Sequence, residues 1–112
     1  MADVAPVTTA PLTVVTLPDE IDMANADAIG EEFAAALAPG VRVVIADMTA
    51  TTFCGSAGIN TLIRAKKRAA ASGAEIRLLL PRPNVLRVLK MQGVDAVLPV
   101  YHSLEAALAG AR

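Results

Sequence analysis

The sequence is poor in the residues that catalysis, metal binding and disulfide bonds use. It has 112 residues, among them one cysteine (Cys54), one histidine (His102) and only 3% aromatic residues. A single cysteine cannot form an intramolecular disulfide, so we expect a reducing compartment. One histidine without identified partners does not form a Ser–His–Asp triad. Cys54 and His102 alone are too few ligands for a metal site. We therefore predict a protein that is not an enzyme and needs no metal or cofactor, with Cys54 as a small buried apolar residue and His102 at the surface.

Strong charge of either sign and long hydrophobic runs are also lacking. The net charge is −1, whereas nucleic-acid binders usually concentrate basic charge on one face, so we do not expect nucleic acid as a partner. No apolar run approaches the ~18 residues of a membrane helix. The N-terminus does not show the basic and then apolar segments of a secretory signal. These absences predict a cytoplasmic protein without direct membrane insertion. A Gly-Lys-Ser/Thr phosphate loop is absent as well.

Apolar residues make up 54% of the chain and fall into short runs that are typical of strands. Strands are predicted over residues 12–17, 41–48 and 75–80, with a further short strand within 94–100. The second run is almost continuously apolar, as in a strand that is covered on both faces of its sheet. Residues 1–11 form a separate N-terminal segment in which Val4–Thr8 could be a short edge strand, although Pro6 argues against it.

Apolar residues at helical spacing predict four helices that alternate with these strands. The first is capped by Asp22 or Asn25 and is closed by Pro39–Gly40. The second runs over residues 56–72, the third begins at Pro83 and ends at Gly93, and the last is capped by Ser103. Alternating strands and helices predict an α/β fold with a mostly parallel or mixed sheet, and we expect a single domain over residues 12–112.

The second predicted helix carries a cluster of four cations: Arg64, Lys66, Lys67 and Arg68. The cluster lies toward the C-terminal end of the helix, where positive charge favours the helix dipole. It is either a solvated helix surface or a docking site for a partner, and the sequence leaves both open.

The most informative segment runs from Asp47 to Gly58, out of a strand and into a helix that begins at Ser56. As a structural residue, Ser56 is an N-cap, which contributes about 1 kcal/mol. As a functional residue, it is a phosphorylation switch, because unpaired N–H groups and the dipole at a helix start accept negative charge. Gly58 costs roughly 1 kcal/mol relative to alanine in a helix. Its presence indicates close approach, either of a partner or of the neighbouring strand.

This segment resembles the STAS domain, and in particular the bacterial anti-sigma factor antagonists. That family has Asp-Leu-Ser/Thr at a strand end, then Thr-Phe, then Asp-Ser-Ser/Ala-Gly at a helix start. The matching residues here are Asp47-Met48-Thr49, Thr52-Phe53 and Gly55-Ser56-Ala57-Gly58. Three further landmarks match at Asp19–Asp22, Leu89–Val94 and Ser103–Leu108. The resemblance covers about residues 12–110 and implies a mixed, mostly parallel sheet of four to five strands with about four helices.

The resemblance also implies a function. In that family the serine that matches Ser56 is phosphorylated by the anti-sigma factor, which is itself a serine kinase. The unphosphorylated antagonist binds the anti-sigma factor and frees the sigma factor, and a serine phosphatase restores the complex after phosphorylation. The implied partner-binding residues are Asp22, Asn25, Asp47, Gly55, Ser56, Ala57, Gly58 and Asn60. Asp22 could serve in docking and in capping the first helix at once.

Two departures from the family pattern leave other functions open. Gly55 stands where the family usually has aspartate, and Asp19 replaces the glycine of the first landmark. Losing the carboxylate before Ser56 lowers the local acidity and loosens the backbone. A second hypothesis is therefore constitutive binding of the partner without a switch. A third is a STAS interaction subunit of a transporter or a signalling scaffold, since such modules often carry a degenerate switch.

Overall fold

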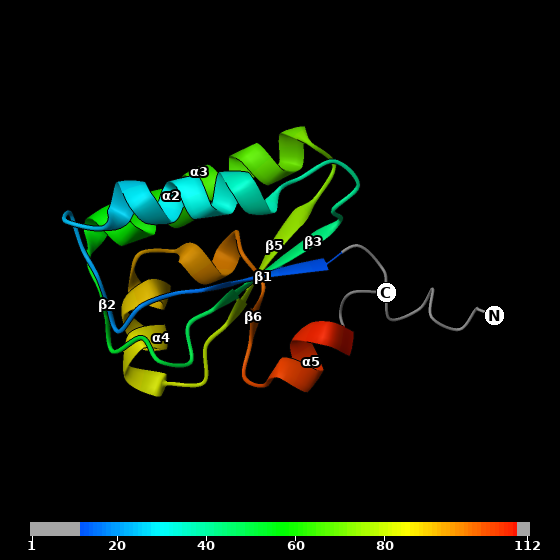
Figure 1. The fold of residues 1–112 in the computed structure, drawn as a ribbon. Coiled ribbons are helices and arrows are strands. Elements are labelled where there is room, and N and C mark those ends of the chain that lie inside the picture. The colour runs from blue at the N-terminus through cyan, green and yellow to red at the C-terminus, as the bar shows by residue number, and fades with distance from the viewer. Residues whose placement is uncertain (1–11, 110–112) are drawn as a thin grey trace.

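Four parallel strands form the central sheet of the computed structural model, which describes residues 12–109 (Figure 1). In order across the sheet, the strands are β1 (Leu12–Thr16), β3 (Val43–Asp47), β5 (Glu75–Leu79) and β6 (Val100–Tyr101). The predicted α/β class and mostly parallel sheet are confirmed. The edge strand suggested at Val4–Thr8 lies outside the described residues.

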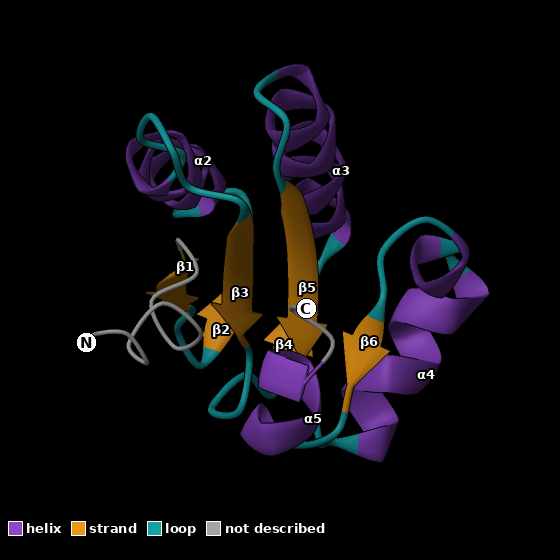
Figure 2. Cartoon of the chain, turned by 90° about the vertical axis from the view of Figure 1, so that its right-hand side faces the viewer, coloured by secondary structure: helices purple, strands orange, loops and turns teal. Residues whose placement is uncertain are grey.

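Helices cover both faces of this sheet. They are α2 (Ala26–Ala36), α3 (Ser56–Ala71), α4 (Pro83–Met91) and α5 (Leu104–Ala109), with a single 3₁₀ turn, η1 (Val94–Ala96). Helices α2 and α3 lie side by side over one face, and α5 packs on the other (Figures 1 and 2). Helix α4 closes the end of the larger core, in which its Val85 and Leu89 are buried.

Strand β3 divides its side chains between two cores. Val44 and Ala46 belong to the larger core, beneath α2 and α3. Val43 and Ile45 belong to a smaller core that α5 covers through Ala107. Because successive side chains of a strand point to opposite faces, a strand covered on both sides has to be apolar throughout. This explains the continuous apolar run, although β3 itself is shorter than the predicted 41–48.

The segment after α4 differs from the prediction. A short strand was expected within residues 94–100, but η1 occupies its first half and β6 begins only at Val100. Val94 and Leu98 are almost fully buried, and the Val94 carbonyl accepts hydrogen bonds from the N–H groups of Val97 and Leu98. These bonds satisfy the backbone within the turn itself, so residues 94–98 reach the core through Val94 and Leu98 without pairing to a neighbouring strand.

The sequence did not indicate a second, two-stranded pair in which β2 (Glu20–Ile21) runs parallel to β4 (Phe53–Cys54). These strands have two residues each, which is too short for an alternating pattern. The available signal in the sequence was an apolar residue in each polar turn, Ile21 and Cys54. In the structure the two residues pair, and Ile21 is 1% exposed and Cys54 5% exposed. The pair brings the turn after β1 against the start of α3.

Candidate functional site

The start of α3 is set by Gly55 rather than by Ser56. Gly55 has an extended backbone with φ −82° and ψ −179°, and it is the N-cap residue. Its N–H donates to the Ile21 carbonyl at 2.9 Å, and its own carbonyl accepts from the Ile59 N–H at 3.0 Å. The prediction that Ser56 caps the helix is therefore wrong. Because the contact with β2 holds Gly55 extended, the helix begins one residue later, and Ser56 is its first residue.

Ser56 remains an exposed hydroxyl at the positive end of a helix. The N–H groups of Ser56, Ala57 and Gly58 belong to the first turn, where no preceding turn supplies carbonyl acceptors. That turn contains no acidic residue, and no side chain caps it. Its partial positive charge is thus not compensated within α3, which suits a phosphate group on the first residue.

Gly58 is buried and lies where another part of the chain passes close to α3. A Cβ at this position would lie 2.5 Å from Ile21 Cγ2 and 2.9 Å from Cys54 Sγ, far inside normal contact. Of the two explanations for this glycine, the structure supports internal packing. Gly58 lets α3 approach the β2–β4 pair. Contact of Gly58 with a partner stays a prediction.

Cys54 lies in the same contact and behaves as the sequence predicted. It is a free cysteine and is buried. Burial raises the pKa of its thiol from 9.0 to about 11, because a thiolate would lose its hydration there. Cys54 therefore remains a neutral, small apolar residue at physiological pH.

The turn between β2 and α2 is held by side chains that had been predicted to cap the helix. Asn25 is at the N-cap position, but its side chain makes no cap bond. It accepts from the Asp22 N–H at 3.0 Å and donates to the Glu20 carbonyl at 2.7 Å. The Asp22 carboxylate accepts from the Ala24 N–H at 2.9 Å. Capping of α2 by either side chain is thus a wrong prediction, because both side chains close the turn instead.

Asp47 and Asp19 hold the two loops that lead into the site. The Asp47 carboxylate accepts hydrogen bonds from the Thr49 N–H at 3.0 Å and the Thr49 hydroxyl at 2.7 Å, which shapes the loop after β3. The Thr52 hydroxyl donates to the Asp19 carboxylate, and the Thr52 N–H donates to the Asp19 carbonyl at 2.8 Å. Asp19, which departs from the family glycine, therefore ties the first loop to the second.

The predicted site residues gather at the carboxyl end of the sheet, which is where ligands of open α/β sheets commonly bind. Hydrogen bonds join the turn of Asp22 and Asn25 to Gly55 through Ile21, while Ser56, Ala57 and Asn60 follow along α3. Ser56 and Asn60 are exposed, and Ala57 is partly buried. No hydrogen bond in the described chain links Asp47 to α3, since its carboxylate bonds Thr49.

Two exposed apolar residues of this region were not predicted as functional. Met23 is 84% exposed in the turn after β2, and Phe53 is 52% exposed in β4. The sequence carried one signal: Phe53 directly follows two threonines, in a chain with only two phenylalanines.

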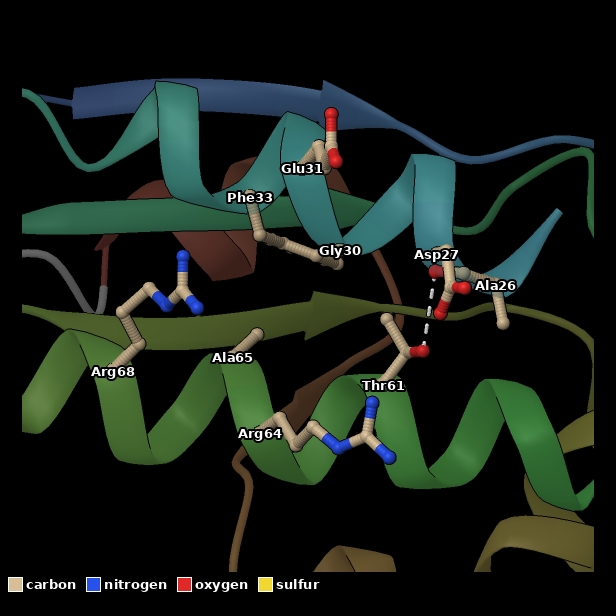
Figure 3. A pocket seen from close by; sticks show the side chains of 9 residues that line it. All are labelled: Ala26, Asp27, Gly30, Glu31, Phe33, Thr61, Arg64, Ala65 and Arg68. Carbon is tan, nitrogen blue, oxygen red and sulfur yellow. Dashed lines mark hydrogen bonds between the residues drawn. The ribbon is translucent and has the colours of Figure 1, made fainter.

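A groove between α2 and α3 receives half of the basic cluster (Figure 3). Its volume is about 270 Å³, and Arg64 and Arg68 of α3 line it together with Asp27 and Glu31 of α2. These two cations share the groove with carboxylates and are exposed, which agrees with a solvated helix surface, and docking of a partner there stays a prediction.

Two structural features are absent from the described residues. Between residues 12 and 109 no group of three His, Cys, Asp or Glu residues is placed to hold a metal ion. Within the same range no helix has the length and apolarity needed to cross a membrane. His102, as predicted, is exposed.

Comparison with known proteins places these features in a family. Residues 3–107 match the model of the STAS domain. The chain belongs to the STAS domain family. This STAS chain is 29% identical over 98 residues to BtrV of Bordetella bronchiseptica, a proposed anti-sigma factor antagonist, with 88% of this chain and 84% of BtrV covered.

Solved structures agree with the fold of this STAS chain. The crystal structure of an anti-sigma factor antagonist from Mycobacterium paratuberculosis superposes with a TM-score of 0.81 at 26% identity, over 91% of this chain and 86% of that one. The murine anion transporter Slc26a9 contains a region that superposes with a TM-score of 0.77 over 95% of this chain and 19% of the transporter. At 21% identity, that second likeness shows the fold alone.

Proposed function

We propose that this STAS protein is an anti-sigma factor antagonist that is switched by phosphorylation of Ser56. It binds an anti-sigma factor of the serine-kinase type and so releases the sigma factor. The observation that carries the proposal is the exposed Ser56 hydroxyl at the uncompensated positive end of α3. The relatives support it, since BtrV and the M. paratuberculosis protein are named as antagonists of this kind.

The switch acts at the surface around Ser56, which we call the docking surface, and it leaves the fold intact. The kinase transfers the terminal phosphoryl group of ATP to the Ser56 oxygen, and ADP and the serine proton leave. The phosphate carries about −1.5 to −2 charges at pH 7. The N–H groups of the first turn of α3 tolerate that charge. A partner that covers Ser56 would have to bury the charge unpaired, which costs several kcal/mol, so the complex dissociates.

The chain supplies the phosphate acceptor and no catalytic group, and we assign it no enzymatic activity. A serine phosphatase would remove the phosphate and restore binding. We propose that this cycle takes place in the cytoplasm.

The test is to incubate the protein with a cognate anti-sigma kinase and ATP and to map the product by mass spectrometry. We expect one phosphate on Ser56, none on Ser56→Ala, and loss of the complex in step with modification. Absence of binding to every anti-sigma factor, in both the modified and the unmodified state, would overturn the proposal.

Gly55 favours a second version in which binding is constitutive. The φ of −82° at Gly55 is open to any residue, and a Cβ there would meet the Phe53 ring at 3.3 Å. Because Phe53 is half exposed, its ring can move by a few tenths of an ångström. Gly55→Asp is therefore a feasible variant that restores the family's carboxylate. We expect faster phosphorylation of this variant, and equal rates in the two proteins would contradict our explanation of Gly55.

A third candidate is an interaction subunit of a transporter or a signalling scaffold. The missing carboxylate at Gly55 favours it, and the fold of this chain also occurs in a region of the transporter Slc26a9. Affinity purification of the intact protein separates the two classes. Recovery of transporter or scaffold subunits without an anti-sigma factor would favour this candidate over the antagonist.

A further inference from the structure

We infer that Phe53 and Met23 are the apolar anchors by which the docking surface around Ser56 holds its partner. This inference rests on the proposed function and names the contacts that give the complex its affinity. The occupant is the basic surface of an anti-sigma factor that has apolar pockets for these two side chains.

The exposure of the two residues is the first observation. Phe33, the other phenylalanine of the chain, is 1% exposed, whereas Phe53 is 52% exposed. Met23, at 84%, is the most exposed large hydrophobic residue in the described part of the chain. Neither side chain contributes to the two cores. The fold therefore does not account for an aromatic and a methionine at these positions.

The position of both residues beside Ser56 is the second observation. Phe53 precedes Ser56 by three residues, and its ring edge lies 3.3 Å from where a Cβ would extend from Gly55. The glycine thus leaves room for the ring next to the start of α3. Met23 follows Ile21 by two residues, and the Ile21 carbonyl accepts from the Gly55 N–H. Both anchors therefore come from the junction that positions Ser56.

Charge identifies the kind of partner. The β2 segment and the turns on either side of it carry three carboxylates, Asp19, Glu20 and Asp22, and no cation. Arg82 is a cation at this end of the sheet, where its Nε donates to the Thr49 carbonyl at 3.2 Å. An acidic border around apolar anchors is complementary to a basic surface with apolar pockets, and such a border guides the approach of the partner.

The anchors, rather than the acidic border, should dominate the affinity. An exposed ion pair changes a binding constant by roughly fivefold at most. Aromatic residues that become fully buried at an interface change it by about tenfold or more when truncated to alanine. Phe53 is the larger of the two anchors and lies next to the modified residue, so we expect it to matter more than Met23.

The experiment compares Phe53→Ala and Met23→Ala with Met91→Ala in binding to a cognate anti-sigma factor. Met91 is a matched control, because it is a methionine, is 77% exposed and lies on α4 outside the docking surface. We expect Phe53→Ala to weaken binding by about tenfold or more and Met23→Ala by roughly threefold to tenfold, mainly through faster dissociation. Met91→Ala should stay within about twofold of the wild type. The variant Phe53→Leu, which keeps an apolar side chain, should recover part of the affinity.

The possible results separate this inference from the proposed function. If the wild-type protein binds no anti-sigma factor, the proposed function fails, and this inference fails with it. If the wild type binds and both Phe53→Ala and Met23→Ala bind equally well, only the anchors are refuted. Circular dichroism on each variant checks the fold. Should Phe53→Ala unfold, Phe53→Leu and Met23→Ala still decide, because leucine keeps an apolar side chain beside Gly55 and Met23→Ala leaves Phe53 unchanged.

Discussion

Ser56 suits the proposed switch because its neighbours Gly55 and Gly58 provide the helix cap and the close packing contact. Gly55 provides the extended cap residue, and Gly58 provides the close contact with β2. The Ser56 hydroxyl makes no cap bond and is exposed. Modification of Ser56 therefore changes a surface group and removes no internal contact.

Ser56→Asp should weaken partner binding while the free energy of unfolding stays within about 1 kcal/mol of the wild type, because an acidic group is favourable at a helix N-terminus. Calorimetric binding and urea unfolding measure the two effects. Ser72→Asp is a control at the opposite end of α3, where the Ser72 hydroxyl bonds the Ala69 carbonyl at 3.2 Å. It should lower stability modestly and leave binding unchanged. Loss of folding in Ser56→Asp would mean that Ser56 is chiefly structural.

Because the Cys54 thiol is buried, we expect the protein to lose stability in alkaline solution. Burial raises the pKa of its thiol from 9.0 to about 11 in the folded protein. Between these values the unfolded chain releases the thiol proton and the native chain keeps it, so the unfolded state binds fewer protons and stability falls as pH rises. Below about pH 9 this contribution is complete. Urea unfolding from pH 8 to 11 should therefore show a steeper decline for the wild type than for Cys54→Ala, and parallel declines would contradict the assignment.

At the level of elements, α3 is placed by a contact between two segments that lie far apart in the sequence. The two-residue strands β2 and β4 make the surface on which the first turn of α3 rests. Asn25 then fixes the turn from β2 into α2 by bonds to Asp22 and Glu20. The start of α3 and the turn beside it are thus joined through β2 by hydrogen bonds and packing.

Gly58→Ala tests this contact. Its Cβ would lie 2.5 Å from Ile21 Cγ2, so we expect a loss of about 1–3 kcal/mol from overpacking, which exceeds the helix-propensity gain of alanine. Gly30→Ala in α2 is the matched control, because its Cβ would meet only Thr61 Cγ2 at an ordinary 3.8 Å. That variant should gain up to about 1 kcal/mol. Urea unfolding measures both, and a stabilised Gly58→Ala would refute the close contact.

At the level of the whole molecule, Arg77 ties the smaller core to the sheet. Its side chain is 4% exposed on β5, and its Nη1 donates to the Ala107 carbonyl of α5 at 2.9 Å. Its Nε pairs with the Glu75 carboxylate at 2.5 Å, and the guanidinium lies 6.0 Å from the centre of the Tyr101 ring. A short helix with one buried alanine is thus held by a polar contact as well as by apolar packing.

Arg77→Ala should destabilise the protein by about 1–3 kcal/mol, because the Ala107 carbonyl loses its partner in a buried position. Hydrogen exchange should increase first in α5. Glu75→Gln, at a side chain that is 52% exposed, should cost less than about 1 kcal/mol. Partner binding at Ser56 should be preserved in both folded variants, since α5 covers the other face of the sheet. Equal effects of the two substitutions would show that Arg77 matters only through Glu75.

The sequence by itself determined the features that depend on neighbours along the chain. Pro83 occupies the first position of α4, and the Ser103 hydroxyl accepts from the Ala106 N–H at 3.1 Å, both as predicted. Gly73 and Gly93 have φ of +78° at the ends of their helices, where only glycine fits easily. Periodicity and end signals of this kind act over a few residues and can be read directly.

Tertiary structure alone decided the details of the proposed docking site. Ile21 and Cys54 lie 33 positions apart, and their pairing holds Gly55 extended, starts α3 at Ser56 and fills the space above Gly58. The same pairing leaves Phe53 in solvent while its neighbour in β4 is buried. Such a pairing depends on contacts between segments that are distant in the sequence and meet only once the sheet has formed. A local sequence pattern does not indicate these contacts.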